Sequence, residues 1–179
     1  FLANAHKTDA GYFVDQTNML YKGYGASKYV FPEKELARVL DGAAQKRGSA
    51  YSSVVEMQTV SGEHKKEIVI ARIVREKKNL SMRYCGTMIY LVAPEELAAS
   101  FLMEHDDLVI VDADKNVIFS SLNEDKQADF FEKMHQGGKK YEMMDLNGEK
   151  YFVTSLASPK LGWQYYNISD YYRLFAFIH

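Results

Sequence analysis

Two stretches of the sequence follow one plan: YFVDQTNMLY at residues 12–21 and VIVDADKNVIF at residues 109–119. Each is an apolar run that ends in Val-Asp, followed by a polar turn that contains Asn and then by a second apolar run. Asp and Asn favour turns because their side chains bond the nearby backbone, so each stretch predicts a β-hairpin. The sequence therefore predicts the same hairpin once in each half of the chain.

Two further landmarks recur in the same order. Ser61-Gly62-Glu63 precedes a strand-like run in the first half, as Asn147-Gly148-Glu149 does in the second. The stretch 86–91, followed by PEEL, corresponds to the stretch 162–167, followed by SDYY. One matched hairpin would be weak evidence, but three landmarks in one order favour two copies of one small α+β module.

The first module is predicted to contain two strands, a helix and three more strands. Pro32 opens the helix and Gly48 ends it, with an apolar stripe between them. Residues 23–29 are expected to form a loop. A short second helix is expected to start at Pro94, with Leu97, Ala98, Phe101 and Leu102 on one face. The predicted strands are 11–14, 19–22, 51–60, 67–75 and 84–92, and the predicted stripe is Leu36, Val39, Leu40, Ala43 and Ala44.

The second module repeats this order. A hairpin over 108–121 is followed by a helix with Asn123 as its N-cap and Gly137-Gly138 as its end. Strands over 140–144, 151–155 and 163–168 complete the sheet. Neighbouring strands joined by hairpins give antiparallel sheets with helices on one face, which is the PAS-like arrangement. The absence of a βαβ series argues against a parallel Rossmann-type sheet.

Composition limits the functional classes. The chain has 179 residues, 47% hydrophobic content and a net charge of -2, which suits one or two globular domains and not a nucleic-acid binder. Lys77-Lys78 and Lys139-Lys140 are interpreted as solvated pairs. Cys85 is the only cysteine, so neither an intrachain disulfide nor a thiolate metal cluster can form.

Several catalytic and metal motifs are incomplete or absent. Residues 112–116 mimic the start of a calcium loop, but Val117 and Asn123 replace the Gly and Glu that such a loop needs. The five histidines have no metal-ligand spacing, and no nucleophile elbow, P-loop or dinucleotide motif occurs. We therefore expect no catalytic residues, no metal and no cofactor, and we interpret Cys85 as a small buried hydrophobic residue.

The second hairpin carries a family resemblance. The run from Val109 to Ser121 resembles the Cache-domain hairpin, and GEKYFVTS at residues 148–155, with Leu161-Gly162-Trp163 behind it, resembles the closing strands of the same domains. Cache domains are extracytoplasmic sensor modules of bacterial transmembrane receptors. Residues 86–97 resemble the strand and helix that join the two lobes of a double Cache sensor. The resemblance covers nearly the whole chain, more strongly after Gly86 than before it.

The resemblance implies a membrane-distal lobe at residues 1–93 and a membrane-proximal lobe at residues 94–179. The apolar residues 174–178 are too few to cross a bilayer, which takes about 20, but they could begin a transmembrane helix. The long N-terminal helix of the family is missing, as though cut away before Phe1. That helix often carries the dimer interface of the family, so a homodimer is expected only as one possible state of the full-length receptor. Asn116 stands where the family commonly has Gly, and Asn tolerates a left-handed backbone.

One arginine suggests a ligand site. Side chains alternate along a strand, so Arg72 shares a face with Ile68, Ile70 and Val74 and is expected to point into the core. A buried arginine needs a partner, either an internal carboxylate such as Glu56 or the carboxylate of a ligand. The resemblance implies a ligand in the distal lobe, and the candidate site residues are Tyr51, Arg72, Tyr84 and Tyr90.

We therefore expect a sensing ectodomain on the extracytoplasmic face of a bacterial membrane, not an enzyme. Its partner would be a small molecule, such as a carboxylate or amino acid, or a solute-binding protein. The receptor could be a two-component histidine kinase, a chemoreceptor or a membrane-bound transcription regulator. The alternative is a cytoplasmic PAS-type module for protein association or cofactor sensing, which a flavin or haem absorbance spectrum would reveal.

Overall fold

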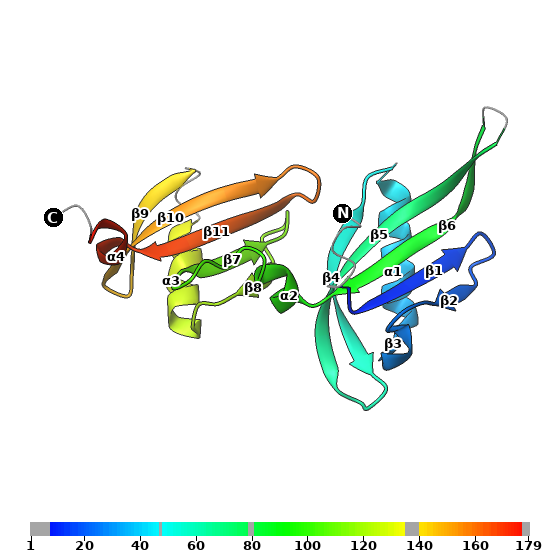
Figure 1. The fold of residues 1–179 in the computed structure, drawn as a ribbon, viewed down its shortest axis with the longest axis horizontal. Coiled ribbons are helices and arrows are strands. Elements are labelled where there is room, and N and C mark those ends of the chain that lie inside the picture. The colour runs from blue at the N-terminus through cyan, green and yellow to red at the C-terminus, as the bar shows by residue number, and fades with distance from the viewer. Residues whose placement is uncertain (1–7, 47, 79–80, 135–139, 177–179) are drawn as a thin grey trace. The chain divides into compact units, whose positions relative to one another are not determined.

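The chain folds into two compact units, residues 1–97 and 98–179, and a computed structural model describes residues 8–46, 48–78, 81–134 and 140–176. Each unit is an antiparallel sheet with helices (Figure 1), so the predicted α+β class is confirmed. The division falls after Leu97, within the helix that begins at Pro94, and the lobe boundary at residue 93 stays a prediction.

The first unit has a six-stranded sheet in the order β2-β1-β6-β5-β4-β3. Its elements are β1 Ala10–Asp15, β2 Leu20–Lys22, the 3-10 helix η2 Ala26–Lys28, β3 Tyr29–Val30, α1 Glu33–Gln45, β4 Tyr51–Thr59, β5 His64–Lys78 and β6 Ser81–Val92, followed by α2 Pro94–Ala98. Helix α1 lies across one face of this sheet (Figure 1).

Two features of this sheet differ from the prediction. The expected loop 23–29 ends in a short strand, since Tyr29 pairs with Thr59 and Val30 with Gln58. Between the predicted strands 67–75 and 84–92 the chain continues as a long hairpin as far as Lys78, where Glu76 pairs with Arg83; residue 79 lies outside the described residues. Backbone pairing continues there although the apolar pattern has ended, because hairpin strands satisfy each other's hydrogen bonds without a buried face.

Helix α1 begins after Pro32, as predicted, and covers the core of the first unit. Val39 and Ala43 are fully or almost fully buried against strands β1, β4, β5 and β6. Ala44, which the predicted stripe placed inside, is exposed. The predicted helix at Pro94 is real but ends at Ala98, so Phe101 and Leu102 lie beyond it and are exposed.

The second unit has a five-stranded sheet in the order β8-β7-β11-β10-β9. Its elements are β7 Asp107–Val111, β8 Val117–Ser120, α3 Glu124–Met134, β9 Tyr141–Leu146, β10 Glu149–Ser158, β11 Trp163–Asp170 and α4 Tyr171–Phe175. The predicted cap is confirmed, because the backbone N–H of Lys126 donates to Asn123 Oδ1 at 2.9 Å. The predicted helix end at Gly137-Gly138 lies outside the described residues.

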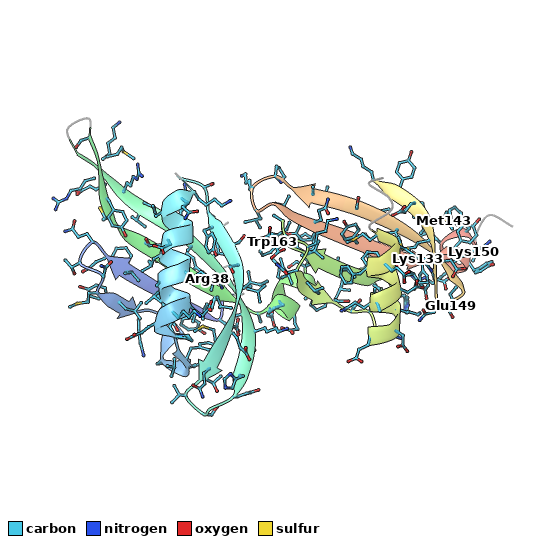
Figure 2. All side chains as sticks on the ribbon, turned by 180° about the vertical axis from the view of Figure 1, so that it is seen from behind. Arg38, Lys133, Met143, Glu149, Lys150 and Trp163 are labelled. Carbon is cyan, nitrogen blue, oxygen red and sulfur yellow. The ribbon has the colours of Figure 1, made fainter. Side chains whose placement is uncertain are left out.

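The core of the second unit is built around Phe130 on α3. Its ring is fully buried and meets Tyr166 of β11 edge-on, with the ring centroids 5.3 Å apart. Phe131 on the same helix is half-buried and also packs edge-on against Phe130. Lys133, labelled in Figure 2, contacts Asp129 on its own helix and the backbone carbonyl of Asp145 in β9, and the second contact ties α3 to that strand.

The two predicted hairpins close with the same turn. Asp15 Oδ1 accepts from the backbone N–H of Thr17 and Met19 at 2.8 and 3.0 Å. Asp112 Oδ1 accepts from the backbone N–H of the residues at the same two offsets, Asp114 and Asn116, at 2.9 and 2.8 Å. This shared geometry gives structural support to the interpretation of the chain as two copies of one module, and it agrees with a hairpin turn at residues 112–116.

The backbone of the turns corrects one detail. The left-handed residue is the third after the aspartate in both copies, Asn18 with φ 63° and Lys115 with φ 66°. Asn116 was expected to take that conformation, but its side-chain amide donates instead to Asp112 Oδ2 at 2.9 Å. The amide thus reinforces the turn while the less suited lysine adopts the strained conformation.

Removing the aspartate should loosen the second hairpin. We expect Asp112→Ala to lower the free energy of unfolding by about 1–2 kcal/mol, because two backbone N–H groups and one amide lose their acceptor. Urea denaturation followed by circular dichroism measures this. Asp112→Asn keeps an acceptor oxygen and should lose less. Asp114→Ala in the same turn is the matched control, and an equal loss there would contradict the assigned role.

Candidate functional site

The structure corrects the expected environment of Arg72. The residue is exposed, although Ile68 and Ile70 on the same strand face are buried. The reason is that β4 pairs with β5 only as far as Ala71, so no strand lies beside Arg72 on that side of β5. Glu56, the expected internal partner, is also exposed and lies 3.5 Å from His64 Nδ1. The prediction of a core-facing arginine was wrong.

The three candidate tyrosines lie on both faces of the sheet. Tyr51 faces α1, where its ring lies so close to Gly42 that a Cβ there would come within 2.4 Å. Tyr90 lies on the opposite face, with its ring over Gly11. The ligand role of these residues stays a prediction, but the structure does not bring the four candidates together.

Tyr84 is displaced by a β-bulge. Val74 pairs with Gly86 and Arg75 pairs with Tyr84, so Cys85 has no partner in the ladder. An extra residue reverses the alternation of side chains beyond it, which puts Tyr84 on the face opposite to Tyr90. Its hydroxyl lies 3.2 Å from Thr87 Oγ1. Cys85 itself is half-buried, so its expected full burial is not met.

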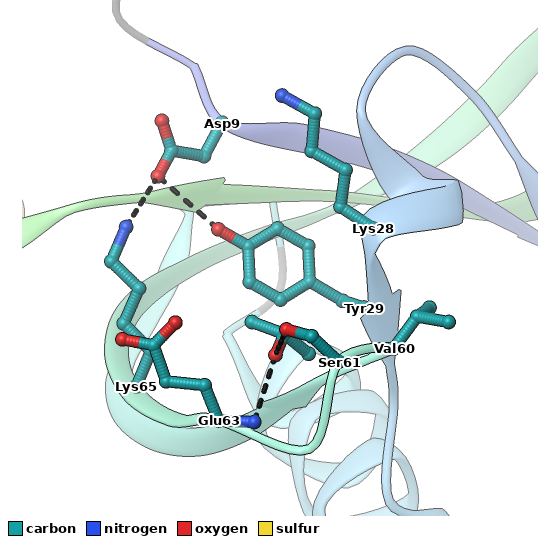
Figure 3. A pocket seen from close by; sticks show the side chains of 8 residues that line it. Asp9, Lys28, Tyr29, Val60, Ser61, Glu63 and Lys65 are labelled. Carbon is teal, nitrogen blue, oxygen red and sulfur yellow. Dashed lines mark hydrogen bonds and ion pairs between the residues drawn. The ribbon is translucent and has the colours of Figure 1, made fainter.

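A pocket opens at the end of the first sheet where β3, β4 and β5 meet (Figure 3). It has a volume of about 660 Å³. Side chains of both charges surround it, and the backbone N–H of Val60 donates to the carbonyl of Lys28 at 2.9 Å. The lining residues are Asp9, Lys28, Tyr29, Thr59, Val60, Ser61, Glu63 and Lys65.

Close backbone contact places Asp9 at this pocket. The backbone N–H of Asp9 donates to the carbonyl of Leu91 at 2.9 Å, which extends the pairing of β1 with β6. Gly25 packs against Asp9 so tightly that a Cβ would lie 1.9 Å from the Asp9 carbonyl oxygen. Gly25 also has φ 69°, so both space and conformation require glycine there.

Four polar side chains form a connected cluster beside the pocket. The Tyr29 hydroxyl donates to Glu67 Oε1 at 2.9 Å and lies 3.3 Å from Asp9 Oδ2. Lys65 Nζ lies 3.3 Å from Asp9 Oδ2 and 3.2 Å from Glu67 Oε1. The Tyr29 and Lys65 contacts to Asp9 are drawn in Figure 3. The cluster ties the segment before β1 to strands β3 and β5.

Glu67 is the most constrained member of the cluster. Its side chain is fully buried, and Oε2 has no hydrogen-bond partner within residues 8–46, 48–78, 81–134 and 140–176. Burial raises the pKa of Glu67, although hydrogen bonds from Tyr29 and Lys65 oppose the shift. A buried carboxylate is costly unless it is paired, so Lys65 is required to keep it charged.

The neighbours of Glu67 have shifted pKa values too. Burial raises the pKa of the Tyr29 hydroxyl, and its hydrogen bond to Glu67 raises it further. Burial disfavours the charged form of Lys65, but the hydrogen bonds and negative charges of Glu67 and Asp9 outweigh this and raise the pKa of Lys65. Lys65 therefore carries a positive charge at neutral pH, at the wall of the pocket.

Sequence reasoning missed this cluster. Glu67 has the same parity as Val69 and Ala71, both fully buried, so strand alternation alone could have identified a buried carboxylate. Strand alternation could not have identified Asp9 or Tyr29, because Asp9 precedes β1 and Tyr29 lies in a strand of two residues. No group of three His, Cys, Asp or Glu side chains suited to a metal ion occurs among the described residues.

Comparison with known proteins finds a likeness in fold. No protein-family model and no curated protein matches the sequence. The structure matches the ligand-binding domain of the Pseudomonas aeruginosa PAO1 amino acid chemoreceptor PctB in complex with L-Arg, with TM-score 0.67 and 10% identity over 97% of this chain and 76% of that one.

Two other solved structures show the same architecture. The ligand-binding domain of the Pseudomonas fluorescens chemoreceptor CtaA in complex with L-leucine matches with TM-score 0.62 and 16% identity, over 98% of this chain and 76% of that one. The extracellular domain of soHK1S-Z6, described as a histidine kinase, matches with TM-score 0.58 and 13% identity over 98% and 75%. The fold implied by the double Cache resemblance is therefore confirmed. None of the helices in the described ranges has the length and apolar character of a membrane span.

The raised pKa of Glu67 predicts a pH dependence of stability. A carboxyl group whose pKa is higher in the folded state stabilises the fold below its unfolded pKa, near 4.5, and this contribution is lost as the pH rises through the folded pKa. Relative to Glu67→Gln, the wild-type protein should therefore lose free energy of unfolding as the pH rises from about 4. Urea denaturation of both proteins over a pH series measures the difference, and a difference that does not change with pH would contradict the prediction.

Proposed function

We propose that this chain is the extracytoplasmic sensing ectodomain of a bacterial transmembrane receptor and that its first unit binds a small molecule. The observation that carries the proposal is that both units together align with ligand-binding domains of chemoreceptors over nearly the whole chain. The likeness to an extracellular domain of a histidine kinase supports the same class. The receptor is a histidine kinase, a chemoreceptor or a membrane-bound transcription regulator.

The pocket beside Asp9 is the proposed binding site. It offers the cationic side chains of Lys28 and Lys65 together with the carboxylates of Asp9 and Glu63. Groups of both signs around one opening suit a ligand that carries both an ammonium and a carboxylate, since charge-assisted hydrogen bonds are the stronger kind. An amino acid is therefore the proposed ligand class, in agreement with the ligands of the two chemoreceptor domains.

Binding would act by shifting a population of conformations. A ligand changes an equilibrium only by its difference in affinity for the two states. Ligand contacts to Asp9 and Lys65 would strengthen one arrangement of the segment before β1 against β3 and β5. The second unit would then carry the change toward the membrane through α4.

A buried carboxylate supports α4 as the exit of the signal. Asp106 precedes β7, and only 8% of its side chain is exposed. Its Oδ2 accepts from Ser169 Oγ at 2.9 Å and Asn167 Nδ2 at 3.0 Å, and its Oδ1 pairs with Arg173 Nη2 at 2.5 Å. Arg173 lies in α4, whose first turn is capped by Asp170. The helix begins at Tyr171, because β11 extends to Asp170.

Ligand binding should raise thermal stability. At a free concentration of about 100 times Kd, a ligand that binds only the folded state adds about 2.7 kcal/mol. We expect at least one of L-arginine, L-leucine and L-alanine to raise the melting temperature in a thermal-shift assay. Lys28→Met should weaken that response about tenfold in apparent Kd, because the pocket loses one ammonium group.

Two controls locate the ligand. Lys34→Met removes an exposed lysine of α1 that does not line the pocket, and it should leave the response unchanged. Arg72→Ala tests the site suggested by the sequence. A response that disappears with Arg72→Ala but survives Lys28→Met would move the ligand to the opposite face of the sheet. No response to any amino acid would contradict the proposed ligand class.

The Asp106–Arg173 ion pair predicts the behaviour of α4. Asp106→Asn keeps an acceptor for Ser169 but loses the charge that holds Arg173, so backbone amides of residues 171–176 should exchange about five to ten times faster in hydrogen–deuterium exchange. Glu104→Gln, two residues earlier and well exposed, is the matched control. Exchange that is unchanged in Asp106→Asn would show that α4 is held by other contacts.

A further inference from the structure

Strands β5 and β6 project beyond the rest of the first sheet (Figure 1). β4 pairs with β5 only over residues 64–71, and β1 pairs with β6 only over residues 86–91. Residues 75–78 of β5 and 81–85 of β6 therefore pair only with each other and form a two-stranded ribbon. The hydrophobic core of the first unit includes no residue of this ribbon, so its side chains are not explained by packing.

The two faces of the ribbon carry different charge patterns. On one face Glu76 lies opposite Arg83, so an acid and a base are cross-strand neighbours. On the other face Arg75 lies opposite Tyr84 and Lys77 lies opposite Met82. The bulge at Cys85 creates this second face, because it turns Tyr84 to the side of Arg75. We call these four residues, Arg75, Lys77, Met82 and Tyr84, the basic-apolar patch.

The patch is exposed and its charges are not neutralised. Tyr84 is 40% exposed and Met82 is 60% exposed, while Arg75 and Lys77 are also exposed. Neither cation forms an ion pair with a carboxylate in the described portion of the protein. The patch thus combines two unpaired positive charges with two large side chains that lose contact with water only when something covers them.

We propose that the basic-apolar patch is a docking surface for an acidic segment of a partner protein. Carboxylates of the partner would pair with Arg75 and Lys77, and apolar side chains of the partner would cover Met82 and Tyr84. This surface is separate from the pocket beside Asp9, so it does not depend on the proposed ligand.

The composition of the patch favours a protein over an anionic membrane. Arg, Tyr and Met are enriched at the centres of protein interfaces, and Arg and Tyr are frequent among the residues that dominate binding energy. Lipid-binding surfaces instead gather about 4–8 Lys or Arg residues. Among the described side chains of the ribbon, this face carries two cations, and each is opposite Tyr84 or Met82.

A peptide probe tests the proposal. A short fluorescein-labelled peptide in which glutamate alternates with leucine should bind the wild-type protein in fluorescence anisotropy, more weakly at high salt. The variant Arg75→Gln/Lys77→Gln should bind about tenfold more weakly, because it loses both charge-assisted contacts. Met82→Ser should also weaken binding, which charge alone does not explain.

The opposite face provides a matched control. Arg72→Gln/Arg83→Gln removes two positive charges from the opposite face of β5 and β6 but leaves the patch intact, and it should bind the peptide as the wild type does. Circular dichroism verifies that each variant is folded. Equal weakening by both double variants, or no binding of the peptide by the wild type, would overturn the proposal. Binding to phosphatidylglycerol vesicles that requires Arg75 and Lys77 would replace the protein partner with a lipid surface.

Discussion

The register of the two hairpins is the constraint on which both units depend. It is fixed where the carboxylates of Asp15 and Asp112 each bind two backbone N–H groups of their turn. Slipping a strand by one residue would move its whole apolar set to the other face. Because β1 pairs with β6, and β7 with β11, each turn also aligns a longer strand whose inward side chains fill the core. One local motif thus determines which face of each sheet can receive a helix.

Strand alternation predicted the fold well wherever one face is covered. The order of elements, the antiparallel pairing and the Asn123 cap all followed from local patterns. The same rule failed beyond Ala71, where no neighbouring strand continues and Arg72 is exposed. The rule failed again at Cys85, because a β-bulge there reverses the alternation of side chains and no residue type in the sequence predicts a bulge. Strand β3 was missed because two residues are too short to show a period.

The candidate site was harder to predict because it has no local motif. Asp9, Tyr29, Lys65 and Glu67 come from two strands and a strand entry, and only tertiary pairing brings them within hydrogen-bond distance. Glu67 follows charged residues in the sequence, which suggests a solvent-exposed carboxylate. Strand alternation, however, places it on the same face as Val69, which is buried. The tyrosines chosen from the sequence were attractive as residue types, but their strand positions place them on different faces.

The ribbon formed by β5 and β6 has a consequence for the evolution of the protein. Most substitutions in a core must be compensated by neighbouring side chains, since interiors are close-packed. The ribbon is outside the core of the first unit, so drift in its side chains meets little selection for folding. Substitutions there can therefore change what the ribbon binds while the sheet beneath it stays folded.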